Sequence, residues 1–242
     1  MKFNVSSKAL YNAASAVSKV INSKNALSIL DNFLFVIEGT KLTITGSDVE
    51  NALTARVELA SASGDGSFCI GARRLVELLK ELPDQGVEIA VNDETLEIQL
   101  SYSAGNYSFV GIPSAQYPSF EADKDSEPIS FSLATQQLIE GLDNTLFAVS
   151  DDEYRRIMQG VLLKVSEDHI CMVATDTRKL VRFIDRRTAP GVSGSCVIPA
   201  KPSAILKNVF AKEETLNITM TSRSAIIESE NYTFQCTFLN GN

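Results

Sequence analysis

Two aspartates occupy the positions at which a divalent cation or an acid–base step is easiest to imagine. Asp48 and Asp176 each lie between two stretches that alternate apolar and polar residues, and they are 128 positions apart. Carboxylates bind hard cations, but a catalytic or metal site needs several groups that converge on one point. Because the two residues occupy corresponding places in similar segments, each is more simply the aspartate of a tight turn, which accepts backbone hydrogen bonds. An enzyme that uses both with a divalent ion is kept as an alternative.

Other residue types that carry chemistry do not form a recognisable catalytic set. The only histidine, His169, lies in an alternating stretch and is expected to be a solvent-facing strand residue. The pair Gly64 and Gly66 lacks the later glycine that opens a nucleotide-binding helix. No two cysteines form a CxxC pair, so we expect buried, reduced thiols and neither a metal nor a cofactor. The cysteines are Cys69, Cys171, Cys196 and Cys236.

The 128-residue offset extends over most of the chain and defines an internal repeat. Phe3 aligns with Phe131 and Leu34 with Leu162, without a gap and in both helical and strand-like segments. Such agreement across two periodicities is hard to obtain by chance. The sequence therefore predicts two copies of one domain, residues 1–124 with a linker and residues 125–242.

Each copy is predicted to contain two helices and several strands. Apolar residues recur at helical spacing in 8–21, 72–82 and 135–149, and again after Pro199. Ser6 or Ser7 is expected to cap the first helix. The fold class is α+β, with two helices packed beside antiparallel sheets in each copy. Residues 61–66 are expected to form a turn and residues 113–128 an extended linker. The strands predicted in the first copy are 2–5, 29–37, 41–46, 52–59, 67–70, 87–91, 95–100 and 106–112.

Composition and charge restrict the possible environments and partners. The chain has 44% hydrophobic residues and no apolar stretch near the ~20 residues that span a bilayer, so we expect a soluble protein with no membrane partner. Because no secretory signal is visible at residues 1–4, we expect a cytoplasmic location. The net charge of −8 argues against a globally basic nucleic-acid-binding surface.

Basic residues are nevertheless concentrated on the predicted polar faces and ends of helices. They form either a basic stripe that contacts phosphates or ordinary solvated helix faces. Tyr107 and Tyr232 lie in predicted strands, which makes binding of single strands by base stacking less favoured. The basic residues are Lys19, Lys24, Arg73, Arg74, Lys80, Lys201, Lys207 and Lys212.

Several short motifs, in order along the chain, resemble those of the bacterial DNA polymerase III β subunit, the β sliding clamp. The resemblance covers both copies, and no single motif is diagnostic. It implies repeated α+β domains of the DNA-clamp fold, with helices that line a hole. It also implies a non-catalytic ring that encircles duplex DNA and tethers the replicative polymerase. The motifs are Met1–Phe3, Leu42–Asp48, Ala72-Arg73, Met158–Gly160, Val173–Asp176 and Val197–Pro199.

The resemblance also assigns residues to three kinds of contact. Those implied to contact DNA are Lys24, Arg73 and Lys201, together with Arg156. Arg156 and the acidic Asp151 and Asp152 match DNA-contacting positions that hold other residue types in the family, and the acidic pair is doubtful there. Those implied to form one wall of a hydrophobic peptide cleft are Met158, Thr175, Thr177, Arg178, Lys179 and Leu180. Those implied to lie at the subunit contact of a homodimeric ring are Arg74, Leu78 and Leu82. The chain departs from the family pattern at Thr177-Arg178-Lys179, where Gly-His-Arg is common.

The family has three domains in each subunit, and a clamp loader and the polymerase bind its cleft. The third domain is absent from this sequence, so we expect a truncated chain that holds half of the peptide site. The alternatives are a self-sufficient two-domain protein that closes a trimeric ring, or a non-enzymatic DNA-binding module.

Overall fold

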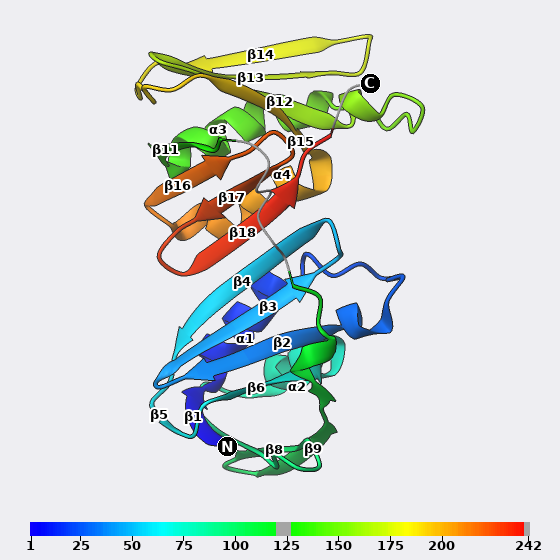
Figure 1. The fold of residues 1–242 in the computed structure, drawn as a ribbon, viewed down its shortest axis with the longest axis vertical. Coiled ribbons are helices and arrows are strands. Elements are labelled where there is room, and N and C mark those ends of the chain that lie inside the picture. The colour runs from blue at the N-terminus through cyan, green and yellow to red at the C-terminus, as the bar shows by residue number, and fades with distance from the viewer. Residues whose placement is uncertain (120–126, 240–242) are drawn as a thin grey trace. The chain divides into compact units, whose positions relative to one another are not determined.

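The computed structural model describes residues 1–119 and 127–239 and divides the chain into two compact units, Met1–Phe120 and Glu121–Asn242 (Figure 1). In each unit two α-helices pack against strands that pair only in the antiparallel sense. The structure confirms the α+β class with antiparallel sheets.

Unit 1 consists of two five-stranded sheets and two helices. The strand orders are β5-β1-β7-β8-β9 and β10-β6-β2-β3-β4. The elements are β1 (Lys2–Ser6), α1 (Ser7–Val17), β2 (Asn32–Glu38), β3 (Lys41–Ser47), β4 (Asn51–Glu58), β5 (Ser61–Ser63), β6 (Gly66–Gly71), α2 (Ala72–Glu81), β7 (Gly86–Val91), β8 (Glu97–Tyr102), β9 (Gly105–Val110) and β10 (Ile112–Pro113).

Unit 2 repeats this plan with four strands in each sheet. The strand orders are β14-β13-β12-β15 and β18-β17-β16-β11. The elements are β11 (Ile129–Ala134), α3 (Thr135–Thr145), β12 (Gly160–Ser166), β13 (His169–Thr175), β14 (Leu180–Asp185), β15 (Gly194–Pro199), α4 (Ala200–Val209), β16 (Thr215–Met220), β17 (Ser224–Glu228) and β18 (Tyr232–Thr237).

The repeat seen in the sequence is also a repeat of strand register. Leu42 lies opposite Val57 in the β3–β4 pair, and Ile170 lies opposite Asp185 in the β13–β14 pair. Leu42 and Ile170 are 128 residues apart, and so are Val57 and Asp185. A register shift of one residue would move every side chain of a strand to the opposite face of the sheet. The shared register therefore places equivalent side chains in the two cores.

The helices form where capping and apolar spacing favour them, and they approach the sheets closely. Ser6 Oγ accepts a hydrogen bond from the Ala9 N–H (3.2 Å), which caps α1 as predicted. A Cβ added to Gly46 on β3 would lie 2.7 Å from Val17, and one added to Gly141 on α3 would lie 2.5 Å from the Met172 sulfur. The glycine that permits close packing is therefore on a strand in unit 1 and on a helix in unit 2.

Several predicted boundaries were wrong. The apolar stretch that begins at Ile29 is first a 3-10 helix, Ser28–Asp31, and the strand starts at Asn32. The α3 helix ends at Thr145, and Leu146–Ala148 is a 3-10 helix. The small-residue stretch 61–66 contains β5, which pairs with β1.

The predicted linker is partly a packed segment of unit 1. Residues 112–113 pair with β6, and Ser114–Gln116 forms a 3-10 helix. The Tyr117 ring is buried against Leu30 and Cys69. The rest of the predicted linker includes residues 120–126, which lie outside the described residues.

The four cysteines are buried and free of disulfides, as predicted. Burial raises the pKa of the Cys69 thiol to about 11 and that of the Cys236 thiol to about 12. None of the helices in the described ranges is long and apolar enough to cross a membrane.

Candidate nucleic-acid and peptide interfaces

The unit 1 cations predicted to contact DNA lie beside a surface hollow of about 690 Å³. Arg73, in the first turn of α2, lines the hollow together with Asn22 and Ser23, and Lys24 follows in the same exposed loop. The Arg73 side chain is 89% exposed, and its Nε donates to Glu77 Oε1 at 2.8 Å. This pairing raises the pKa of Arg73. A cation at the N-terminal end of a helix, beside exposed polar side chains, suits an anion such as phosphate.

The corresponding region of unit 2 mixes both signs of charge, as does the unit 1 hollow, which Asp31 and Glu77 line together with Arg73. Lys201, in the first turn of α4, lines a hollow of about 360 Å³ together with Asp151 and Glu153. Arg156 is exposed in the 3-10 helix Arg156–Met158. The structure therefore places an acidic residue beside a predicted DNA-binding lysine, which gives a physical reason for the doubt about Asp151.

An exposed aromatic residue in unit 2 was missed by the sequence interpretation, which considered only Tyr107 and Tyr232. Tyr154 is 98% exposed, in the segment that also contains Asp151 and Glu153. Tyr232, in contrast, packs its ring 5.6 Å from that of Phe210. The signal available in the sequence was an aromatic residue within an acidic, aperiodic segment, where no core explains it.

The turn between β13 and β14 gathers most of the predicted peptide-cleft residues. Asp176 Oδ1 accepts from the N–H groups of Arg178 (3.0 Å) and Lys179 (2.9 Å), and its other oxygen pairs with the Lys179 ammonium. Thr175 Oγ1 accepts from the Thr177 N–H and donates to the Lys179 carbonyl. The hydrogen bonds to Asp176 hold its pKa well below the ordinary value.

This turn carries a strained residue at its centre. Thr177 has φ +77°, a left-handed conformation that favours glycine and disfavours β-branched side chains. The equivalent residue of unit 1, Val49, has φ +84°. The position after each turn aspartate therefore has the same backbone in both copies, although neither residue is glycine.

Two predicted cleft residues lie outside this turn. Leu180 begins β14 with a 68% exposed side chain, as an unpartnered apolar group at a sheet edge would be. Met158 is half-buried in the 3-10 helix that precedes β12. The assignment of these six residues to a peptide cleft stays a prediction.

Two of the predicted subunit-contact residues, Arg74 and Leu78, lie one turn apart on α2, and Leu82 follows directly after the helix end. Arg74 is exposed, and Leu78 and Leu82 are half-buried, whereas Leu75 and Leu79 are fully buried. The apolar face predicted for residues 72–82 is therefore only partly buried. The partial exposure of Leu78 and Leu82 leaves apolar surface at the positions implied for a subunit contact, which also stays a prediction.

The two turn aspartates lie in separate units and each completes its own turn. Asp48 Oδ1 accepts from the Asn51 N–H at 2.8 Å, as a turn aspartate does. Within residues 1–119 and 127–239, no cluster of three or more His, Cys, Asp or Glu side chains is arranged to hold a metal ion. His169 is only partly exposed, and its Nδ1 lies 2.5 Å from Asp168 Oδ1.

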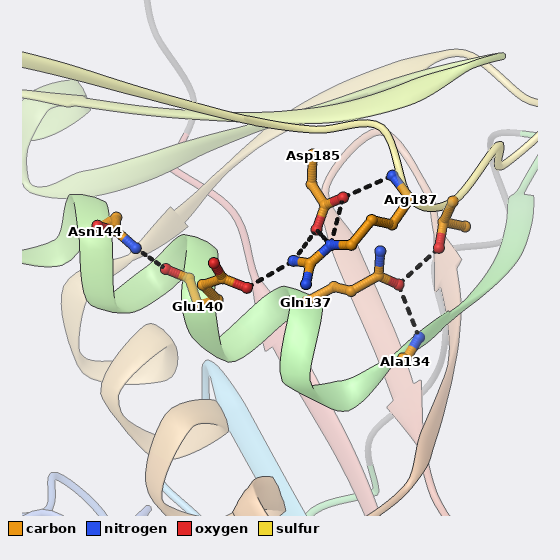
Figure 2. Close-up of polar contacts among 7 residues, drawn as sticks. Ala134, Gln137, Glu140, Asn144, Asp185 and Arg187 are labelled. Carbon is orange, nitrogen blue, oxygen red and sulfur yellow. Dashed lines mark hydrogen bonds and ion pairs between the residues drawn. The ribbon is translucent and has the colours of Figure 1, made fainter.

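An ion pair between the buried Asp185 and Arg187, whose side chain is 57% exposed, lies at the end of β14 and was not predicted (Figure 2). The Asp185 side chain is 2% exposed and accepts from the Arg187 backbone N–H (2.7 Å) and Nε (2.9 Å). Arg187 also donates to Glu140 at 2.6 Å. The guanidinium holds the pKa of Asp185 below its ordinary value. The pair fixes the strand that follows the β13–β14 turn.

Comparison with known proteins gives matches along nearly the whole chain. Residues 1–121 match the family model of the DNA polymerase III beta subunit, N-terminal domain, and residues 132–242 match that of the central domain. The beta sliding clamp of Pseudomonas aeruginosa is 28% identical over 88% of this chain and 58% of its own length. That of Bacillus subtilis is 27% identical over 100% of this chain and 66% of its own length.

Solved structures of sliding clamps agree with the fold. A sliding clamp (DNA polymerase III subunit beta) from Pseudomonas aeruginosa bound to griselimycin superposes with a TM-score of 0.93 and 25% identity. It is matched over 100% of this chain and 65% of its own. The chain thus spans roughly three fifths to two thirds of the length of these proteins.

Proposed function

Because the chain belongs to the DNA polymerase III beta subunit family, we propose that it forms part of a sliding clamp. Such a ring encircles duplex DNA and keeps a replicative DNA polymerase on its template, with no catalytic role and no cofactor. The observation that carries the proposal is the match of both domain models, in order, to a chain that superposes on solved clamps over its whole length.

The charge distribution supports a weak, sequence-independent contact with DNA. The four α-helices carry six Lys or Arg and four Asp or Glu, a net charge of +2, although the whole chain carries −8. Cations on helix faces attract phosphates without reading bases. We assign this contact to Lys24, Arg73, Lys201 and Arg156. Enclosure by a ring then provides retention, so each phosphate contact stays weak enough for sliding.

The turn between β13 and β14 supports a role in tethering. Together with Met158, the residues Thr175, Thr177, Arg178, Lys179 and Leu180 would form one wall of a cleft for short peptides of the polymerase and the clamp loader. The exposed Leu180 offers the apolar contact that a peptide needs. Thr177 has a left-handed backbone, at the position where glycine is common in the family.

Ring closure requires more than the two units described. We assign Arg74, Leu78 and Leu82 to a subunit contact with another copy, in a cytoplasmic homodimer whose subunits each contain a third domain. The mass of the assembled ring in solution separates this arrangement from three two-domain chains.

Retention on topologically closed DNA tests the proposal. The natural gene product that contains this chain is loaded by its clamp loader onto circular duplex DNA, and bound protein is measured before and after a single double-strand cut. We expect retention on the circle and release after linearisation, because the protein then slides off the ends. Equal retention on both forms would overturn the sliding-clamp proposal.

A further inference from the structure

Two cationic side chains on the helices form ion pairs with carboxylates. Arg73 on α2 donates from Nε to Glu77 Oε1 at 2.8 Å, one helical turn further on. Lys207 on α4 forms an ion pair with Asp143 on α3. Unit 1 therefore pairs its cation within one helix, and unit 2 pairs its cation between two helices.

These ion pairs contribute little to the stability of the fold. The Arg73 side chain is 89% exposed and that of Glu77 is 63% exposed. The Lys207 and Asp143 side chains are 41% and 47% exposed. Ion pairs as accessible as these are screened by water and salt. Their main physical effect is thus on the binding of a charged ligand that approaches Arg73 or Lys207.

The two carboxylates are half of the negative charge on the α-helices. Those helices contain four acidic residues, Glu77, Glu81, Glu140 and Asp143. Glu77 and Asp143 pair with a cation of α2 or α4, whereas Glu140 pairs with Arg187 beyond β14. Without Glu77 and Asp143, the helices would carry a net charge of +4 instead of +2.

We propose that Glu77 and Asp143 are attenuating residues, whose carboxylates occupy Arg73 and Lys207 and thereby weaken the contact of the helices with duplex DNA. A phosphate that approaches Arg73 must either displace Glu77 or experience its repulsion. The inference rests on the proposed function, because it concerns the same DNA contact. It adds that the weakness of this contact is set by specific acidic residues, and not only by a small number of cations.

Equilibrium binding to a duplex tests the role of Glu77. Fluorescence anisotropy of a labelled duplex of arbitrary sequence is titrated with the 242-residue chain, starting near about 50 mM salt. We expect Glu77→Gln to tighten binding about threefold, which corresponds to removing the repulsion of one charge roughly 6 Å from a phosphate in water. The salt dependence should steepen by up to about 0.9 in log–log slope, because one more cation contacts phosphate. Asp143→Asn is expected to act in the same direction.

The matched control is Glu81→Gln, which removes the same charge from the same helix. Glu81 lies one turn beyond Glu77 and forms no ion pair within the described part of the chain. Its effect is expected to be less than half that of Glu77→Gln. A second control combines Glu77→Gln with Arg73→Ala, in which the gain should disappear because the released cation is gone.

The outcomes separate this inference from the proposed function. If the wild-type chain binds, Arg73→Ala weakens binding, and Glu77→Gln and Glu81→Gln tighten it equally, then only net charge matters and the attenuating role is wrong. A gain that survives in the Arg73→Ala background is equally contrary to it. If neither the wild type nor any variant binds duplex DNA at low salt, the DNA contact itself is wrong and the inference fails with it.

Discussion

The pair of the buried Asp185 with Arg187 offers a quantitative test, because the internal repeat has apolar residues at both equivalent positions. Asp185 occupies the register position of Val57, and Arg187 is 128 residues from Leu59. Val57 and Leu59 are both buried. The repeat therefore places a buried carboxylate in unit 2 at the position where unit 1 has a buried valine.

We expect Asp185→Asn to lower the free energy of unfolding of unit 2 by about 2 kcal/mol. Hydrogen bonds to a charged group contribute about 1.5–3 kcal/mol. The Asp185 carboxylate accepts from Arg187 both at the backbone N–H and at the guanidinium. An asparagine would keep the backbone bond and lose the charged one, so the lower half of that range applies.

The double variant Asp185→Val, Arg187→Leu reproduces the unit 1 residues. We expect its stability to lie within about 1 kcal/mol of the wild type or above it, because the apolar residues remove the cost of desolvating the buried Asp185 carboxylate. The single variant Asp185→Asn loses an interaction without gaining apolar contact, so it should be the less stable of the two.

Hydrogen exchange of the β13 and β14 amides measures the stability of unit 2 within the full chain. The control is Asp168→Asn, which removes a carboxylate that is 67% exposed and that also accepts from an arginine, Arg186. That change should shift protection by less than about 0.5 kcal/mol. An effect of Asp185→Asn no larger than the control would refute the reasoning, as would a double variant that is as unstable as the single one.

The difference in unfolding free energy between the wild type and Asp185→Asn should depend on pH in a defined direction. The folded-state pKa of Asp185 is lower than its ordinary value, so its contribution to stability is present above the unfolded pKa of about 3.9. It is lost as pH falls through the folded-state pKa. The gap between the wild type and Asp185→Asn should therefore be constant near neutral pH and close progressively below about pH 4.

Two further substitutions test local geometry. Thr177→Gly and Val49→Gly should each leave stability unchanged or raise it by up to about 1 kcal/mol, because relief of left-handed strain outweighs the greater chain entropy of glycine; a clear loss in thermal denaturation would contradict this. Gly160→Ala should cost about 1–3 kcal/mol, because its Cβ would lie 2.5 Å from the Ile198 carbonyl oxygen. Gly86→Ala, which meets no atom within 4 Å, is the matched control, and equal denaturation midpoints for the two alanine variants would remove the steric explanation.

The parts of the fold that depend on periodicity were predictable from the sequence. Gapless alignment at 128 residues indicated the two units, and the helical spacing of Leu75 and Leu79 indicated the buried face of α2. Ile29 was misassigned because a short apolar stretch has no periodicity that distinguishes a 3-10 turn from the strand it enters.

The charged part of the candidate sites was harder to predict, because it depends on tertiary neighbours. An aspartate near a strand end normally indicates a turn or a solvated edge, and only Arg187 and α3 explain why Asp185 is buried. The partner of Lys207 lies 64 positions earlier, on another helix. Spacing on a single helix does indicate Arg73–Glu77, since residues four apart are neighbours there.

The buried thiols make the chain its own reporter of local opening. A folded-state thiol that water does not reach reacts with an alkylating reagent only when its surroundings open, so the rate of labelling at each cysteine measures an opening free energy. Cys69 reports on unit 1, and Cys171, Cys196 and Cys236 report on unit 2. Mass spectrometry of the labelled peptides would therefore compare the opening free energies of two copies of one fold within a single molecule, without any introduced probe.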